Sequence, residues 1–303
     1  RLALTTAPGW RAEPAVAPFE AGETGEPAVV SFSVTPPARQ ARDLCRAAAS
    51  IGGEEFSRGV VEVAYPGLPR RAALVPAAAI LLRTDVQVAA RSIGYVMGPG
   101  DEVPDALRQM GCRVTLLDSD ALNRGGLARF EAVVAGVRAF NVRPDLRENL
   151  RRIMEYVQAG GTLVVQYNVA NRRSPEQAAE VGPFPLRIGR DRVVAPDAPV
   201  ALLDPEHPLL SFPNRITGDD FGGWVQERGL YFAAGWDRRY SPLFECHDPG
   251  EKPLQGATLY ARYGEGAYIF TALSWFRQLP AGVAGAYRIF ANFVSASKTA
   301  SRR

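Results

Sequence analysis

Apolar positions from Ser92 onward alternate between two patterns along the chain. Short runs that are apolar almost throughout are typical of strands buried on both faces of a sheet. The segments between them place an apolar residue every three or four positions, as a helix with one buried face does. The predicted strands are residues 93–97, 113–117, 130–137 and 162–166, and the predicted helices are residues 103–110, 145–159 and 282–297.

Strands and helices alternate in this region, and such alternation predicts parallel strands joined by right-handed crossovers. We therefore expect an α/β domain over residues 91–297, with a flavodoxin-like parallel sheet sandwiched by helices. Near its end, Gly264-Glu265 separates two apolar runs and predicts a two-residue hairpin turn. Residues 298–303 are expected to form a disordered tail.

The first 90 residues lack helical periodicity over most of their length. Runs with strand character, bounded by proline and glycine, lie at 27–34, 59–65 and 77–82. They predict a smaller β-sandwich-like segment, and the alternative is an incomplete sandwich whose partner strands precede Arg1. The alanine-rich residues 40–50 predict a short helix or a loop. Because the chain begins at Arg1 rather than at methionine, we expect it to be a piece of a longer polypeptide.

Composition excludes several classes of protein. The chain has 35 basic and 32 acidic residues, a net charge of +3, and no stripe of interleaved basic and aromatic residues, so no nucleic-acid partner is expected. No apolar run is long enough for a membrane span. The cysteines, Cys45, Cys112 and Cys246, are far apart and the chain has only two histidines. We therefore predict no disulfide framework, no metal site and no cofactor.

Five segments resemble a known family. The C-terminal region of large bacterial PIG-L (LmbE-like) deacetylases is similar to residues 94–101, 136–141, 161–168, 224–231 and 274–280. More broadly, residues 92–297 resemble the class I glutamine amidotransferase-like fold, in particular its ThuA-like branch. In the PIG-L family a zinc-dependent N-acetyl-sugar deacetylase domain comes first, and a sandwich-like domain and an amidotransferase-like domain follow it.

The zinc motif of that deacetylase, a Pro-His-Pro-Asp-Asp run, does not occur in this sequence. The resemblance therefore implies an accessory module of such a protein, with the deacetylase domain of the same polypeptide as its partner. Such a module binds a carbohydrate or acts as a scaffold that positions the catalytic domain on one. The resemblance also favours an exported or periplasmic protein over a cytoplasmic one.

The resemblance implies a nucleophilic cysteine at the end of the 162–166 strand, and this chain lacks one there. Gln166, Tyr167 and Asn168 occupy that strand end instead. Cys246 has His247 beside it, but neighbouring residues of a strand point to opposite faces, so the two are a poor catalytic dyad. The sequence therefore favours a non-catalytic module, a pseudoenzyme.

Two strand ends carry candidate ligand-binding residues. Arg138 and Asn141 follow the 130–137 strand, where an arginine suits a carboxylate, a phosphate or sugar hydroxyls. The alternative for Arg138 is an ion pair with Glu131, Asp145 or Glu148.

At the next strand end, Gln166, Tyr167 and Asn168 supply donors, acceptors and an aromatic face, which a neutral polyhydroxylated ligand needs. The alternative for these three is a hydrogen-bonded loop.

Two later segments concentrate tryptophan with charged residues, as sugar-binding surfaces do: Trp224 lies near Arg228, and Trp275 near Arg277. The alternative is that both tryptophans pack in the core and that an ion pair joins Arg228 to Glu227.

Two further functions stay open. One is a hydrolase or isomerase that acts on a sugar or an amide through His207 and Glu227. The alternative for His207 is that it caps a turn between two prolines. The other function is a structural or homo-oligomerisation domain, which an apolar surface patch would favour.

Overall fold

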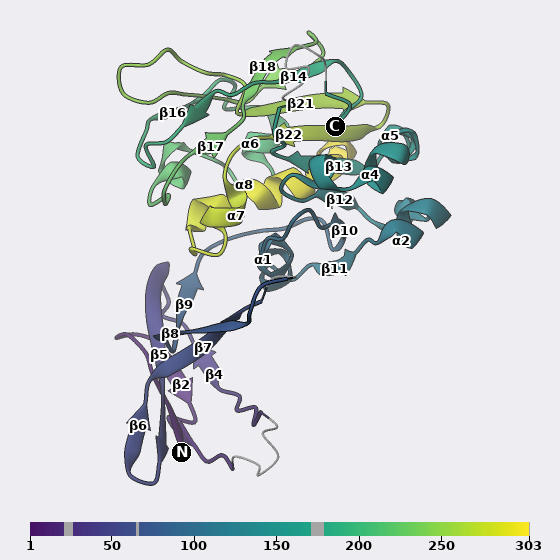
Figure 1. Ribbon diagram of the computed structural model, residues 1–303. Coiled ribbons are helices and arrows are strands. Elements are labelled where there is room, and N and C mark those ends of the chain that lie inside the picture. Colours follow the sequence, from purple (N-terminus) through teal and green to yellow (C-terminus); the bar gives the residue numbers. More distant parts are fainter. Residues whose placement is uncertain (21–26, 65–66, 171–178, 303) are drawn as a thin grey trace. The chain divides into compact units, whose positions relative to one another are not determined.

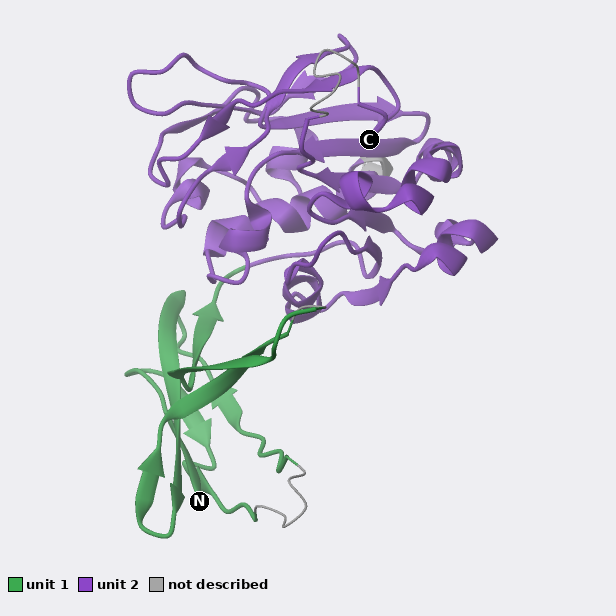
Figure 2. Cartoon of the chain, viewed as in Figure 1, with its two compact units in different colours: residues 1–85 green, residues 86–303 purple. Residues whose placement is uncertain are grey.

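The computed structural model describes residues 1–20, 27–64, 67–170 and 179–302. The chain forms two compact units, Arg1–Asp85 and Val86–Arg303 (Figure 2). The sequence placed the corresponding boundary between residues 90 and 91.

Unit 1 is built from antiparallel strands (Figure 1). Its largest sheet has the order β3-β1-β5-β6, with β9 also paired to β5, and two smaller sheets pair β2 with β4 and β7 with β8. The strands are β1 (Leu2–Thr5), β2 (Arg11–Glu13), β3 (Val16–Ala17), β4 (Ser33–Thr35), β5 (Ala41–Ile51), β6 (Glu54–Phe56), β7 (Arg58–Val63), β8 (Arg71–Pro76) and β9 (Ala78–Arg83).

The prediction of a helix or a loop over residues 40–50 is wrong, because this stretch forms most of the 11-residue strand β5. β5 pairs with β1, β6 and β9. Helix propensity amounts to a few tenths of a kcal/mol per residue, roughly, and pairing with three strands outweighs it.

Unit 2 contains a seven-stranded sheet of order β11-β10-β12-β13-β22-β21-β19. The first five strands are parallel, β21 pairs antiparallel with β22, and β19 pairs antiparallel with β21. These strands are β10 (Ser92–Val96), β11 (Arg113–Leu116), β12 (Ala132–Ala135), β13 (Thr162–Gln166), β19 (Ser241–Pro242), β21 (Thr258–Tyr263) and β22 (Gly266–Thr271).

Between β13 and β21 the chain forms short antiparallel pairs, β14 with β18, β15 with β17 and β16 with β20. They are β14 (Leu186–Ile188), β15 (Arg192–Val193), β16 (Val200–Leu202), β17 (Gly229–Leu230), β18 (Ala233–Trp236) and β20 (Phe244–Cys246).

The helices of unit 2 are short. They are α1 (Val103–Gln109), α2 (Ser119–Arg124), α3 (Ala139–Val142), α4 (Pro144–Glu148), α5 (Leu150–Gln158), α6 (Pro208–Ser211), α7 (Trp275–Gln278), α8 (Ala284–Val294), and the 3₁₀ turns η1 (Leu127–Arg129), η2 (Gly218–Phe221) and η3 (Ala296–Arg302). The 3₁₀ turn η3 includes residues 298–302, most of the segment for which the sequence predicts a tail.

The predicted fold class, a flavodoxin-like parallel sheet sandwiched by helices, is wrong. The main sheet is mixed, and the many small antiparallel sheets and short helices do not form a helix-flanked parallel sheet. The alternating pattern ends at residue 166, and the segment after it was irregular in sequence. That segment folds as antiparallel pairs of two to four residues per strand, too short for a hydrophobic period to indicate which strands pair.

Local predictions fare better. The two-residue turn is confirmed, since Tyr263 pairs with Gly266 and Gly264 takes a positive φ of 60°. The predicted helix 145–159 is divided into α4 and α5 at Asn149, whose side chain donates to Asn123 Oδ1 and to the carbonyl of Asp145.

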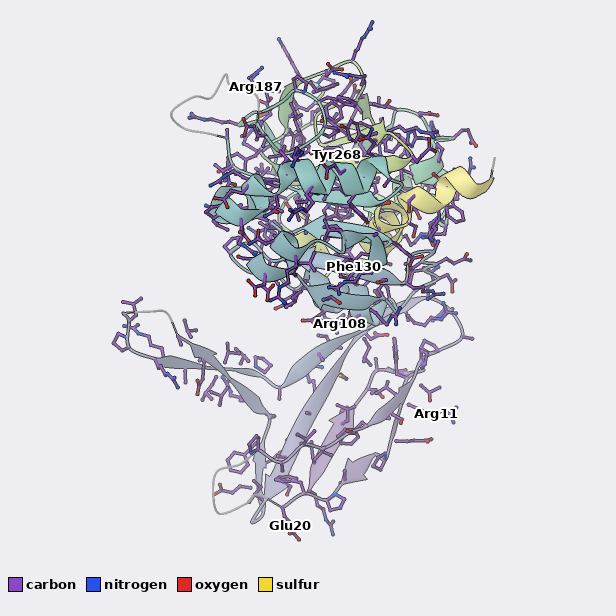
Figure 3. The ribbon with its side chains drawn as sticks, turned by 90° about the vertical axis from the view of Figure 1, so that its right-hand side faces the viewer. Arg11, Glu20, Arg108, Phe130, Arg187 and Tyr268 are labelled. Atoms are coloured by element: carbon purple, nitrogen blue, oxygen red, sulfur yellow. The ribbon has the colours of Figure 1, made fainter. Side chains whose placement is uncertain are left out.

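The interior of unit 2 is closely filled with side chains around Tyr268, whereas Arg11 of unit 1 is exposed (Figure 3). The loops after β10 and β12 meet above this core. A Cβ added to Gly98 would lie 1.9 Å from the carbonyl oxygen of Val137, so only glycine allows this approach. The carboxyl ends of β10, β12, β13 and β22 therefore form one edge of the sheet, at which polar and aromatic side chains gather.

Candidate functional site

Backbone strain marks the carboxyl edge of the sheet. Among the described residues, the non-glycine residues with positive φ are Arg138 (55°), Gln226 (61°) and Tyr231 (58°). This conformation is unfavourable for residues with a Cβ and tends to persist at functional sites. Arg138 follows β12, and Tyr231 stacks on Tyr167 at the end of β13, so two of the three strained residues adjoin the same tyrosine.

Three aromatic rings form what we call the aromatic platform: Tyr167, Tyr231 and Phe276. The rings of Tyr167 and Tyr231 are nearly parallel, with centroids 5.8 Å apart, and the centroids of Tyr167 and Phe276 are 5.6 Å apart. Tyr167 is 8% exposed, while Tyr231 and Phe276 are partly exposed. The platform thus exposes part of the Tyr231 and Phe276 rings to solvent, and both rings pack against the buried Tyr167.

Charged groups border the platform. Arg277 Nε lies 2.6 Å from Glu227 Oε1, and Ser274 Oγ donates to the same oxygen at 3.1 Å. The Arg277 guanidinium also lies 4.8 Å from the ring centroid of Phe276. One carboxylate, one guanidinium and an aromatic face are therefore held together at the rim.

Burial raises the pKa of the Tyr167 phenol, and the positive charges of Arg138 and Arg277 oppose that shift. Both arginines are therefore near the phenol. At neutral pH the hydroxyl stays protonated and is available as a hydrogen-bond donor.

A buried polar chain lies next to the platform. Gln166 Nε2 donates to the Tyr95 hydroxyl at 2.8 Å, and that hydroxyl donates to Asp101 Oδ1 at 2.6 Å. Burial raises the pKa of Asp101, while hydrogen bonds from Tyr95 and from the backbone N–H of Val103 and Val137 oppose the rise. The carboxylate thus links the loops after β10 and β12.

Two buried amide oxygens, Gln166 Oε1 and Asn168 Oδ1, have no hydrogen-bond partner in the described part of the chain. The Asn168 amide nitrogen donates to the carbonyl of Gln166 at 2.9 Å. These two predicted ligand-binding residues are almost completely buried, so Tyr167 is the member of the trio with a ring at the platform.

The predicted residues that follow β12 have different roles. Asn141 exchanges two hydrogen bonds with the backbone of Val169, accepting at 2.8 Å and donating at 3.1 Å, so it fixes the loop after β13. The Arg138 backbone N–H donates to the carbonyl of Tyr167, and its side chain is exposed. Within the described ranges Arg138 forms no ion pair: Glu131 is paired with Lys298, and Asp145 with Arg143.

Three further predicted ligand-binding residues are enclosed. Trp275 is fully buried, and its indole N–H donates to Thr271 Oγ1. Trp224 packs against Trp275 at 5.4 Å between centroids. Arg228 is 3% exposed, and its guanidinium bonds to the carbonyls of Ala198 and Phe221 rather than to Glu227. These residues support the platform from the core.

A depression of about 500 Å³ adjoins the platform. It is lined by Val169, Ala170, Arg190, Arg192, Leu230 and Tyr231. A second cavity, about 320 Å³, lies at the opposite edge of the sheet, next to Glu131 and Gly161. The Glu131 carboxylate in this second cavity is already paired with Lys298 at 2.6 Å. We therefore place the candidate site at the carboxyl edge of the sheet, beside the platform.

His207 and Glu227 have separate surroundings. His207 Nδ1 accepts from the backbone N–H of Leu209 and so caps α6, and its ring packs edge-on against Tyr260. Burial lowers the pKa of this imidazole. Glu227 is bonded to Arg277 and Ser274, and no contact joins it to His207 in the described ranges.

All three cysteines are buried and free. Burial raises the pKa of Cys112 to about 11 and that of Cys246 to about 12, so both remain thiols at neutral pH. His247 Nδ1 lies 2.9 Å from the carbonyl of Asp248, and no described contact joins it to a thiol.

Among the described residues, no group of three or more His, Cys, Asp or Glu side chains is arranged to hold a metal ion. The same part of the chain contains no helix that is long and apolar enough to cross a membrane.

Tyr231, Phe276 and Arg190 were not among the predicted site residues. Tyr231 and Phe276 lie inside segments that sequence comparison singled out, but neither forms a motif by itself. They meet Tyr167 across separations of 64 and 109 residues (231 − 167 and 276 − 167), which only the fold brings together.

No family model matches the chain, and no curated protein matches it. Two solved structures illustrate the likenesses that exist. A β-galactosidase from Rahnella sp. R3 is 15% identical, with a TM-score of 0.39 over 69% of this chain and 31% of that one. An exo-β-1,4-mannosidase from Opitutaceae bacterium strain TAV5 is 12% identical, with a TM-score of 0.39 over 67% of this chain and 36% of that one.

The chain therefore spans about a third of the length of these glycoside hydrolases. At these TM-scores the likeness assigns neither a fold nor a function to this chain.

Proposed function

We propose that this chain is a non-catalytic carbohydrate-binding accessory module, with the aromatic platform as its binding face. The observation that carries the proposal is the platform itself: two partly exposed rings, Tyr231 and Phe276, lie against Tyr167 at one edge of the sheet, and the backbone of Tyr231 is strained. The resemblance to PIG-L proteins supports a narrower form, in which the module serves a sugar deacetylase domain of the same polypeptide.

The chemistry of the platform suits a sugar. The C–H faces of a pyranose ring pack against aromatic faces, and its hydroxyls need donors and acceptors around the rim. Tyr231 and Phe276 supply exposed ring surface. The Tyr167 phenol, the Arg277 guanidinium and the Glu227 carboxylate supply the polar partners.

The charges at the platform support binding rather than hydrolysis. Most glycosidases need a pair of carboxylates on either side of the scissile bond. Glu227 is bonded to Arg277 at 2.6 Å, and Asp101 is part of the buried chain with Tyr95. Both carboxylates are engaged by protein groups.

Calorimetric titration of the chain with a panel of oligosaccharides tests the proposal. We expect at least one sugar to bind, and Tyr231→Ala to weaken that binding about tenfold, since removal of a stacking ring costs about 1.4 kcal/mol.

The control for this titration is Tyr263→Ala, which removes a partly exposed tyrosine next to the hairpin turn, outside the platform. This variant should bind as the unaltered chain does. Absence of heat with every sugar would rule out the carbohydrate role and leave a scaffold role.

One observation favours a second function, oligomerisation with another copy of the chain. The β7–β8 hairpin pairs with no further strand in the described ranges, and its residues are almost all exposed. Val60 is 63% exposed and Leu74 62%. An isolated two-stranded hairpin is marginally stable in water, so a partner strand would stabilise it.

The charges of the hairpin fit a second copy. β7 carries Arg58 at its start and Glu62 near its end. Two copies of β7 aligned antiparallel would therefore bring opposite charges together.

A further inference from the structure

The depression beside the platform has an excess of positive charge. Arg190 and Arg192 line it, and the positive charge of Arg138 acts on the phenol of Tyr167, which stacks on Tyr231. Within the described ranges neither Arg138 nor Arg190 has an acidic partner, whereas the nearby Arg277 is neutralised by Glu227. Two exposed guanidinium groups without an acidic partner thus lie near the Tyr167–Tyr231 stack, Arg190 beside Tyr231 and Arg138 near Tyr167.

The local backbone places both arginines at the depression. Residues 189–193 run antiparallel to residues 229–232: Gly189 N–H donates to the carbonyl of Phe232, and Arg192 lies opposite Leu230. Arg190 lies at a bend just before β15, and Arg192 is the first residue of that strand. Both line the depression, whereas Asp191 between them does not.

Arg192 contributes less than Arg190. Its Nη1 lies 3.4 Å from Glu251 Oε2, and both side chains are nearly half exposed. An exposed pair of this kind is weak and is screened by salt. Arg190 and Arg138 are therefore the cations with the greatest need of a counter-charge.

Size and shape agree with a sugar unit bound through charge. A depression of about 500 Å³ is within the range of small-molecule sites. Tyr231 belongs to both the platform and the lining, so a ring stacked on it would have its substituents beside the arginines. Guanidinium binds a carboxylate with two parallel hydrogen bonds, which gives both affinity and orientation.

We infer that the ligand is an acidic saccharide, whose ring lies on Tyr231 and whose carboxylates are bound by Arg190 and Arg138. This inference rests on the proposed function and names the class of sugar that the site takes.

The experiment compares trigalacturonate with its fully methyl-esterified form, which has the same shape without the charge. By calorimetry at low salt, we expect the acid to bind about tenfold more tightly than the ester. Added sodium chloride should weaken binding of the acid and leave that of the ester unchanged.

Variants of Arg190 test whether its guanidinium binds the carboxylate of the ligand. Arg190→Ala should weaken binding of the acid about tenfold and leave that of the ester unchanged. Arg190→Lys should restore part of the loss, because it keeps the charge without the bidentate geometry. Arg238→Ala is the control, since it removes an exposed cation that does not line the depression.

The outcomes separate this inference from the proposed function. Equal affinity for acid and ester, or unchanged binding by Arg190→Ala, overturns the acidic ligand while the carbohydrate role stands. Equal affinity for poly-glutamate and trigalacturonate also overturns it, because the site would then bind anions without regard to the sugar. Failure of every saccharide to bind overturns both.

Discussion

At the scale of single residues, the ion pair of Arg143 and Asp145 connects the loops that follow β10 and β11 to the start of α4. Arg143 Nε lies 2.8 Å from Asp145 Oδ1, and its Nη2 lies 2.5 Å from Oδ2. The same guanidinium donates to the carbonyls of Met97 and Leu117, which follow β10 and β11, and Ser119 donates to the carboxylate. The hydrogen bond from Arg143 lowers the pKa of Asp145 to about 2.

The lowered pKa makes stability depend on acid. Asp145 has a folded-state pKa below its unfolded value of 3.8, so its stabilising contribution is complete above that value and is lost as pH falls toward 2. We expect Asp145→Asn to destabilise the chain by about 1 kcal/mol at pH 7, after allowance for screening, and by almost nothing at pH 2.

Urea unfolding at several pH values measures this difference. The control is Asp120→Asn, which breaks an exposed pair with Arg124 on α2 and should have little effect at any pH. A destabilisation of Asp145→Asn that is the same at pH 2 and pH 7 would contradict the argument.

At the scale of elements, Arg228 connects segments that have no common sheet. Its guanidinium donates twice to the carbonyl of Ala198 and once to that of Phe221, and its own carbonyl accepts from the Ser274 N–H. Burial lowers its pKa to about 10, so the side chain is still cationic at neutral pH. The planar guanidinium therefore satisfies two backbone carbonyls at once.

Arg228→Lys should therefore be strongly destabilising despite the retained charge. The donors of a lysine all sit on a single nitrogen, which cannot replace the separate bonds to Ala198 and Phe221, so a buried carbonyl would lose its partner at a cost of about 3 kcal/mol. Thermal unfolding measures the effect, with Arg262→Lys as the matched exposed control. An unchanged melting temperature would show that Arg228 does not hold these segments together.

Some elements could be predicted from the sequence and others could not. The strands 93–97 and 162–166 were recognisable because they are buried on both faces and apolar throughout. β5 was not recognisable, because an alanine-rich composition says little about strand pairing.

The same limit applies to the candidate site. Arg138 and Tyr167 were recognisable because they follow strands of the sheet. Tyr231 and Arg190 lie next to strands of two residues, whose positions depend on contacts made far away in the chain.

At the scale of the whole molecule, the two units differ in how well their strands are covered. The central strands of the unit 2 sheet are almost completely buried, as in β12, β13 and β22. The β7–β8 hairpin of unit 1 leaves Val60, Val61 and Leu74 largely exposed. This contrast is the basis on which we propose ligand binding for unit 2 and self-association for unit 1.

Val60→Glu tests the self-association. If β7 pairs with a second copy, the added carboxylate at an apolar contact should shift a dimer toward monomer, as seen by light scattering after size-exclusion chromatography. The control is Val29→Glu, which changes an exposed valine outside the hairpin. A monomer in the unaltered chain at every concentration would exclude oligomerisation by this route.

The left-handed backbone of Arg138 and Tyr231 has a consequence for how fast and how tightly a partner is recognised. Because these residues take up their unusual geometry when the chain folds, the surface that we propose as a glycan-binding face is formed before any ligand arrives. Little conformational freedom is left to be surrendered at the moment of association. In the proposed role, strained backbone lowers the stability of the fold by a small amount and keeps the binding face in its binding conformation.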